Sequence, residues 1–282
     1  KEDMAIRILT DSTSDIPRSQ ADQWGLEIAP LKVRFGSEEY IDGVTLMPQE
    51  FYEKLTSSDV LPQTSQVNPE EFCRLFQQYR EQGDEVVGLF ISSDLSGTYQ
   101  SAVAARHICG EEGIYLTDSR TVTFGLGLLV REALRLREAG ATAQQIHQQV
   151  EEMKEKLRFY AAVDTLKYLR MGGRLSGTAA VVGSLLNIKP LIAVQNGKVE
   201  AVHKTRGLAA ALDWMVGQME KDGVEPGSLV MFGHTNAPEL CQQFIEKARQ
   251  RVTIDRWDST AIGSVVGTHA GPGCTGLAYL KP

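Results

Sequence analysis

Hydroxyl side chains and one glycine are concentrated in residues 92–98, which read SSDLSGT. The apolar run 86–91 before them predicts a buried strand, and the helical spacing of the apolar residues after them predicts a helix beginning near Thr98. At a helix start, free N–H groups and the macrodipole favour an anion. Ser96 adds a hydroxyl donor, and Gly97 lets a ligand approach the backbone. This segment therefore predicts a site for a carboxylate or a phosphate.

Helix capping is the alternative interpretation of the same hydroxyls, because Ser and Thr are favoured at the N-cap. One cap, however, requires fewer hydroxyls than this turn contains. The turn also follows the carboxyl end of a predicted strand, which is where ligands bind in open α/β sheets. We therefore carry the anion site forward as a hypothesis, with capping as its alternative.

Strands and helices alternate along the first half of the chain. Apolar runs at 5–9, 26–35, 86–91 and 114–116 predict strands, with a polar loop at 61–66 and helices between the later runs. Such alternation predicts a mostly parallel open sheet with flanking helices. The pattern changes after residue 158, where a hairpin signal at Asn196-Gly197 and a small-residue helix over 177–186 introduce an α+β pattern. We expect an α/β protein with two domains, 1–158 and 159–282.

The overall charge excludes some partners. The 282-residue chain has 29 Lys and Arg against 36 Asp and Glu, a net charge of −7 without a basic stripe, which argues against nucleic acid as a partner. No apolar run is long enough to span a membrane, and no charged-then-apolar leader is visible, so we expect a cytoplasmic protein. The four cysteines form no C-x-x-C pair, which predicts reduced thiols and no structural zinc.

Nucleophilic catalysis is one alternative function for the hydroxyl-rich turn. Ser96 could attack a carbonyl, His269 could act as its base, and Asp11 or Asp118 could orient the histidine. The turn lacks the first glycine of the G-x-S-x-G motif that exposes such a serine. A serine-dependent acyl hydrolase or transferase therefore remains the second hypothesis.

Cofactor motifs are missing from the sequence. No lysine accompanies a glycine-rich phosphate loop, and no G-x-G-x-x-G follows a predicted strand. His203, His234 and His269 are isolated from other candidate metal ligands. We expect neither a bound cofactor nor a metal ion.

Two later residues have the chemistry to assist an anion site. Arg206 follows the second strand of the predicted hairpin, although a plain surface arginine explains it equally well. His269 lies among Gly267, Gly271 and Gly273, in a stretch expected to be a loop whose main chain can touch a ligand. Its imidazole could hydrogen-bond a carboxylate.

Together these segments resemble the DegV family of bacterial fatty-acid-binding proteins. The matching segments occur in family order across essentially the whole chain: TDSTSD at 10–15, TSQ at 64–66, SSDLSGTY at 92–99, TDS at 117–119, LKYL at 166–169, GGR at 172–174 and HAGPG at 269–273. The resemblance implies two α/β domains with a long-chain fatty acid buried in a tunnel between them.

The resemblance also implies roles for particular residues. Thr64 and Ser96 match the hydroxyls that bind the carboxylate, and Arg206 and His269 match its supporting head-group residues. Further support is expected from Ser65, Ser93 and Gly97.

Family members act as non-catalytic carriers for a separate fatty acid kinase, which phosphorylates the bound carboxylate and so feeds phospholipid synthesis. By resemblance, the docking region for such a kinase is expected at Arg174 and its neighbours, and a transient membrane contact is compatible with this role. Two departures from the family pattern are Val67-Asn68 in place of Pro-Ser and Cys274 in place of a small alanine. Cys274 could alter the pocket wall and hence the preference for acyl chains.

Overall fold

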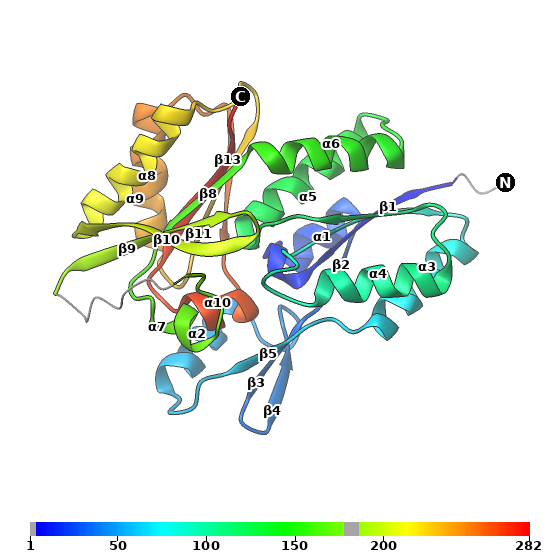
Figure 1. Cartoon of the computed structure of the whole chain (residues 1–282), viewed down its shortest axis with the longest axis horizontal. Coiled ribbons are helices and arrows are strands. Elements are labelled where there is room, and N and C mark those ends of the chain that lie inside the picture. Colours follow the sequence, from blue (N-terminus) through cyan, green and yellow to red (C-terminus); the bar gives the residue numbers. More distant parts are fainter. Residues whose placement is uncertain (1–3, 178–185) are drawn as a thin grey trace.

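The computed structural model describes residues 4–177 and 186–282. These residues form three sheets with helices around them (Figure 1). The helix expected over 177–186 falls almost wholly outside the described residues.

A four-stranded sheet is built from the first half of the chain. Its strand order is β2-β1-β6-β7, and every neighbouring pair is parallel. These strands are β1 (Ile6–Asp11), β2 (Leu26–Ala29), β6 (Glu85–Phe90) and β7 (Ile114–Asp118). They are largely buried apolar runs because helices cover both faces of the sheet. The predicted open parallel sheet is confirmed.

Successive residues of β6 point to opposite faces of this sheet. On one face, Val86 and Phe90 pack with α3 (Pro69–Glu81) and α4 (Thr98–Cys109). On the other face, Val87 and Leu89 pack in the cluster that contains α5 (Thr123–Glu138). The helices α1 (Arg18–Trp24) and α6 (Ala143–Lys156) contribute to the same cluster as α5.

The ends of these helices follow local sequence chemistry. Asn68 Oδ1 accepts the Glu71 N–H at 3.0 Å, and Pro69 occupies the first helical position of α3. Thr142 and Gln145 cap α6 reciprocally, through bonds of 3.2 and 2.9 Å.

The second half of the chain forms a six-stranded mixed sheet in the order β10-β9-β8-β13-β11-β12. Its strands are β8 (Leu157–Ala162), β9 (Ile188–Gln195), β10 (Lys198–Arg206), β11 (Leu229–His234), β12 (Arg256–Ala261) and β13 (Thr275–Leu280). All neighbours are antiparallel except β11 and β12. Helices α8 (Leu208–Asp222) and α9 (Pro238–Arg251) cover one face of the sheet. The division of the chain near residue 158 stays a prediction; the second sheet takes its first strand from Leu157.

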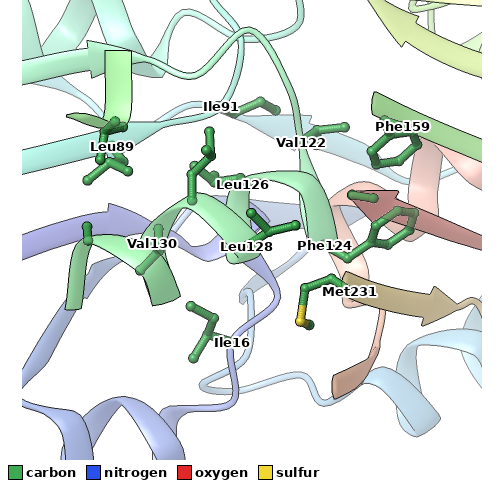
Figure 2. Close-up of a cluster of buried hydrophobic side chains, with 14 of the residues drawn as sticks. Ile16, Leu89, Ile91, Val122, Phe124, Leu126, Leu128, Val130, Phe159 and Met231 are labelled. Atoms are coloured by element: carbon green, nitrogen blue, oxygen red, sulfur yellow. The ribbon is translucent and has the colours of Figure 1, made fainter. Parts of the chain in front are cut away.

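Helix α5 lies between the two large sheets. Figure 2 shows its residues Leu126, Leu128 and Val130 near Leu89 of the parallel sheet and Met231 of the mixed sheet. Both sheets therefore bury apolar side chains against one shared helix.

A third, small sheet corrects two expectations. The single strand predicted over 26–35 is divided at Pro30-Leu31, since β2 joins the parallel sheet and β3 (Lys32–Phe35) joins β4 (Glu38–Ile41) and β5 (Gln63–Ser65). Proline has no N–H to donate to a ladder, which marks the division. The polar loop expected at 61–66 contains β5, because Thr64 pairs with Val33. Beside this sheet lies α2 (Pro48–Ser57).

Asp11 ends β1 with a buried carboxyl group. Its oxygens accept the N–H groups of Thr13 at 2.8 Å and Ile91 at 2.9 Å. Burial nevertheless outweighs these bonds and raises the pKa of Asp11 from 3.8 to about 6. The folded state therefore holds this proton more tightly than the unfolded state. This contribution to stability is complete below the unfolded pKa and is lost as the pH rises through about 6.

We expect Asp11→Asn to flatten this part of the pH dependence. Between pH 4 and 7, the wild-type free energy of unfolding should fall by about 2 kcal/mol more than that of the variant. Urea unfolding at a series of pH values measures both curves, and a variant of exposed Asp59, Asp59→Asn, should follow the wild type. Parallel curves for the wild type and Asp11→Asn would contradict the assignment.

Candidate binding site

A cavity of about 330 Å³ lies between the two large sheets. Its wall is mostly apolar and takes residues from both halves of the chain, among them Ile91, Val122, Phe159, Ile192, Val199 and Val265. One group of lining residues is polar instead: Thr64, Ser65, Gln66, Ser96, Arg174 and His269. The site is therefore amphipathic, because it combines an apolar interior with one cluster of polar side chains.

The aromatic pair Phe124 and Phe159 forms part of the apolar wall (Figure 2). Their rings stack with centroids 4.3 Å apart and planes inclined by 6°. Glycines of the mixed sheet make room for this pair, since a Cβ at Gly233 would lie 2.3 Å from Phe124. Such a wall offers no hydrogen bonds, so it suits a hydrocarbon chain better than water.

Thr64 and His269 meet in the polar cluster, although 205 residues separate them in the sequence. The Thr64 Oγ1 and His269 Nε2 atoms are 3.0 Å apart. Thr64 is held in β5 by its pairing with Val33. His269 lies in the last turn of the short helix α10 (Ser264–Ala270). The glycine-rich loop expected around His269 is thus partly helical.

Ser96 lies at the start of α4, as the sequence predicts. Its Oγ atom accepts the N–H of Thr98 at 3.2 Å and lies 3.0 Å from Thr98 Oγ1. The capping alternative is therefore partly correct, because this bond satisfies one free N–H group of the helix. Since Thr98 can supply both donors to Ser96, the hydroxyl proton of Ser96 is available for a ligand.

Arg174 adds a positive charge to the cluster. Its Nε donates to the Leu95 carbonyl at 3.2 Å, and its Nη1 donates to the Gly172 carbonyl at 2.5 Å. Sequence reasoning placed Arg174 only in a docking region and missed it as a cavity residue. Its position directly after Gly172-Gly173 was the available signal, since glycines allow a close turn back toward a site.

His269 is neutral near pH 7 in this environment. Burial, followed by the nearby charge of Arg174, lowers the pKa of His269 to about 4. The imidazole can therefore donate from one ring nitrogen only. Nδ1 is buried and has no hydrogen-bond partner among the described residues, while Nε2 faces Thr64. A proton on Nε2 would let Thr64 accept from His269 and donate its own hydroxyl proton to a ligand.

The structure brings most of the predicted site residues together. Thr64, Ser65, Ser96, Gly97 and His269 all line the cavity. Gly97 approaches Gln66 closely, since a Cβ at this position would lie 1.9 Å from Gln66 Oε1. These assignments join the hydroxyl-rich turn to two segments that the sequence places far away.

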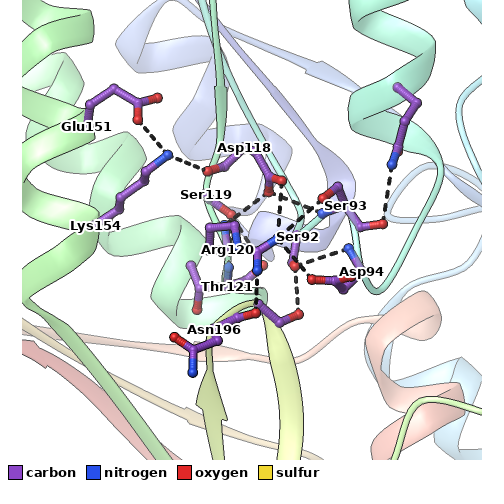
Figure 3. Close-up of polar contacts among 12 residues, drawn as sticks. Ser92, Ser93, Asp94, Asp118, Ser119, Arg120, Thr121, Glu151, Lys154 and Asn196 are labelled. Carbon is purple, nitrogen blue, oxygen red and sulfur yellow. Dashed lines mark hydrogen bonds and ion pairs between the residues drawn. The ribbon is translucent and has the colours of Figure 1, made fainter. Parts of the chain in front are cut away.

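Ser93 lies outside the cavity and in a separate polar cluster (Figure 3). Its N–H donates to Asp118 at 3.1 Å, and its hydroxyl lies 3.5 Å from Arg120 Nη1. Arg120 also donates to the Asn196 carbonyl and pairs with Asp94 at 2.9 Å. The expected support of Ser93 for a head group is not seen, because its side chain faces this cluster instead.

Among the residues that the structure describes, Arg206 is also not one of those that line the cavity. The tip of the β9–β10 hairpin packs on the parallel-sheet side, where Ser92 Oγ donates to the Gly197 carbonyl at 2.6 Å. Arg206 is the last residue of β10, about 26 Å beyond Lys198 for an extended strand. It is exposed there, opposite Ile188. The expectation that Arg206 supports a head group therefore stays a prediction, without support from the cavity lining of the described residues.

The trio suggested for nucleophilic catalysis is not assembled. Within the described part of the chain, no hydrogen bond joins Ser96 to His269, whose Nε2 faces Thr64. Asp11 is bonded to Thr13 and Ile91, and Asp118 belongs to the cluster of Arg120.

The described residues contain neither a candidate metal site nor a candidate membrane-spanning helix. No group of three or more His, Cys, Asp or Glu side chains in residues 4–177 and 186–282 is placed to hold a metal ion. Among the helices of these ranges, none is both long and apolar enough to cross a lipid bilayer.

The fold and the site define an α/β protein with an amphipathic cavity between its two large sheets. A family model described as an uncharacterised protein of the DegV family matches residues 5–282. A DegV domain-containing protein of Caldanaerobacter subterraneus is 35% identical over 275 residues, which cover 97% of this chain and 98% of the relative. The chain therefore belongs to the DegV family.

Solved structures show the same architecture. A DegV family protein from Thermus thermophilus, described by its fatty acid binding, matches with a TM-score of 0.91 and 28% identity, covering 99% of this chain and 100% of the other. A stearic acid-binding protein from Eubacterium ventriosum matches with a TM-score of 0.89 and 26% identity over 98% of both chains. The α/β fold expected from the sequence is confirmed along the whole chain.

The close approach of Gly172 to His269 gives a test of the polar cluster. A Cβ at Gly172 would lie 2.2 Å from His269 Nδ1. We expect Gly172→Ala to push the imidazole away from Thr64 and to raise its pKa from about 4 toward the ordinary value as it becomes exposed. NMR titration of the His269 ring protons measures this change.

Gly217→Ala is the matched control, since a Cβ at Gly217 in α8 meets no atom within 4 Å. This control should leave the His269 titration unchanged. A His269 pKa that stays near 4 in Gly172→Ala would mean that the imidazole is not confined at Gly172.

Proposed function

We propose that this protein binds a long-chain fatty acid, with the acyl chain in the cavity and the carboxylate among Thr64, Ser96, Arg174 and His269. The observation that carries this proposal is the pairing of an apolar cavity with one cluster of hydroxyl, imidazole and guanidinium donors. Relatives of the same fold that are described as fatty-acid-binding support it.

The two parts of the site divide the binding energy. Burial of each methylene gains about 0.8 kcal/mol, so a dozen methylenes give about 10 kcal/mol before the costs of association. Each hydrogen bond to the charged carboxylate contributes about 1.5–3 kcal/mol. Affinity therefore comes mainly from the tail, whereas the choice of a carboxylate comes from the donors.

The donor set suits an anion without an excess of fixed charge. Arg174 supplies the positive charge, and the neutral His269 adds a donor through Thr64. Ser96 adds its hydroxyl proton at the start of α4, where the helix dipole also favours negative charge. A fatty alcohol would fill the same cavity but would forgo the interaction with Arg174.

We further propose that the protein is a non-catalytic carrier that presents the carboxylate to a fatty acid kinase. It would act in the cytoplasm and contact a membrane transiently while it takes up a fatty acid. The cluster is accessible, since Thr64, Ser96, Arg174 and His269 are only half-buried. The strand β10 lies beside this cluster, because its residue Val199 forms a β-bridge with Leu175, the residue after Arg174.

Exposed cations continue along β10. Lys198, Lys204 and Arg206 are all exposed, on a chain whose net charge is −7. This local positive charge suits an acidic surface on a kinase partner or an anionic membrane. Arg206 thereby has a place in docking, outside the head-group site.

Two hydroxyl variants test the head-group assignment. Ser96→Ala and Thr64→Val should each weaken the binding of hexadecanoic acid by about tenfold to a hundredfold, because each removes a hydrogen bond to a charged group. Fluorescence displacement measures the affinities, and the loss for hexadecanol should be several-fold smaller. Ser93→Ala is the matched control and should bind both ligands like the wild type.

Native mass spectrometry of the purified protein gives the complementary result. One co-purified fatty acid per chain supports the carrier. Turnover of activated acyl esters that is abolished by Ser96→Ala would instead establish the hydrolase alternative. Equal affinity of wild type, Ser96→Ala and Thr64→Val would remove both hydroxyls from the site.

Proton uptake on binding is a second consequence of the neutral histidine. A carboxylate beside the imidazole favours its charged form, so binding should raise the pKa of His269 above about 4. At pH 5.5, the wild type should therefore take up a larger fraction of a proton than His269→Gln on binding the same acid. Calorimetry in buffers of different ionisation enthalpy measures this difference. Identical proton uptake in both proteins would show that the imidazole does not sense the ligand.

A further inference from the structure

Two buried carboxyl groups hold the amino end of α10, the helix that carries His269. Asp42 Oδ1 accepts the N–H of Ser264 at 3.1 Å and its hydroxyl at 2.6 Å. Asp15 Oδ1 accepts the N–H of Gly263 at 3.0 Å. Both carboxyl groups belong to the first half of the chain, whereas α10 follows the last-but-one strand of the second half. The contact therefore fixes α10 to the opposite half of the molecule.

The fit between these groups leaves no room for a side chain at Gly263. A Cβ at this position would lie 2.9 Å from Asp15 Oδ1 and 3.1 Å from Asp42 Oδ1. Both carboxyl groups therefore approach the same short stretch of backbone. Asp15 is held in turn by Thr123 at the start of α5, whose hydroxyl donates to Oδ2 at 2.6 Å.

The surroundings of the pair contain no compensating cation. Within residues 4–177 and 186–282, neither Asp15 nor Asp42 forms an ion pair. The other titratable groups facing them are Asp11 and Tyr52, whose hydroxyl donates to the Ile262 carbonyl at 2.8 Å. Hydrogen bonds are therefore what offsets the burial of these two side chains: Asp42 is stabilised first by the Ser264 and Ser12 hydroxyls and Asp15 by the Thr123 hydroxyl, and the N–H groups at the start of α10 add to both.

Anchoring one end of α10 determines where its other end lies. His269 follows Ser264 by five residues, about 7.5 Å along the helix axis. Val265, Val266 and Ala270 of this helix line the cavity together with His269, whereas Asp15 and Asp42 do not. A shift of the helix at Ser264 therefore moves the imidazole relative to Thr64, which belongs to a separate sheet.

We propose that Asp42, assisted by Asp15, is a positioning residue for His269. The two hydrogen bonds from Ser264 to Asp42 hold α10 in the position at which the imidazole of His269 contacts Thr64. The inference rests on the proposed binding of a fatty-acid carboxylate at Thr64 and His269. It assigns to Asp42 an effect on carboxylate affinity without contact between Asp42 and the ligand.

A double-mutant cycle tests this inference with hexadecanoic acid as the probe. Asp42→Ala should weaken binding about tenfold in the wild-type background and less than twofold in the His269→Ala background. Asp42→Asn keeps an oxygen acceptor for Ser264 and should restore most of the affinity. An equal loss in both backgrounds would overturn the inference, because Asp42 would then act independently of the histidine.

The His269 titration gives a readout that does not depend on the ligand. Release of α10 in Asp42→Ala should expose the imidazole and raise its pKa from about 4, whereas Gly217→Ala should leave it unchanged. If His269→Ala binds the acid like the wild type, the proposed head-group role of His269 fails, and the titration alone decides whether Asp42 positions the ring. An unchanged titration in Asp42→Ala overturns the positioning role in either case.

Ser264→Ala provides a milder variant in case Asp42→Ala does not fold. It removes only the 2.6 Å hydroxyl bond and retains the bond from the Ser264 N–H. It should raise the His269 pKa in the same direction by a smaller amount. A Ser264→Ala protein whose titration matches that of the wild type would contradict the proposal.

Discussion

The burial of α5 between two sheets is the constraint on which the rest of the molecule depends. Most residues of α5 (Thr123–Glu138) are buried. The apolar side chains of this helix pack against the parallel sheet on one side and against the mixed sheet on the other. Neither sheet could lose this helix without exposing a large apolar face to water. The cavity lies where this packing is incomplete, near the amino end of α5, where Phe124 and Phe159 form part of its wall.

The polar cluster combines one fixed charge with groups that stay neutral. Arg174 is held by backbone carbonyls, and its charge helps to keep His269 unprotonated. The hydroxyls of Thr64 and Ser96 each have a partner within the protein yet keep a proton to donate. A site built in this way is stable without ligand, because no unpaired charge is buried, and still gains strong bonds when a carboxylate arrives.

Three buried carboxyl groups support the structure around the cavity without lining it. Burial raises the pKa of Asp11, Asp15 and Asp42, so the hydrogen bonds from backbone N–H and hydroxyl donors only partly offset the cost of their charge. Asp15 and Asp42 lie where the two halves of the chain meet, at Gly263 and Ser264. The same TDSTSD segment that ends β1 therefore helps to set the position of a helix near the other end of the chain.

Sequence alone determined the local parts of this molecule. Alternating apolar runs and helical spacing determined the parallel sheet and its helices, and hydroxyls at a helix start located Ser96, because these signals depend on neighbouring residues. Tertiary structure decided the rest. The pairing of Thr64 with Val33 turned a predicted loop into a strand, and Arg206 at the end of β10 is not among the described residues that line the cavity. Arg174 met the Ser96 turn, and His269 met Thr64 across 205 residues, through sheet and helix packing that no local pattern records.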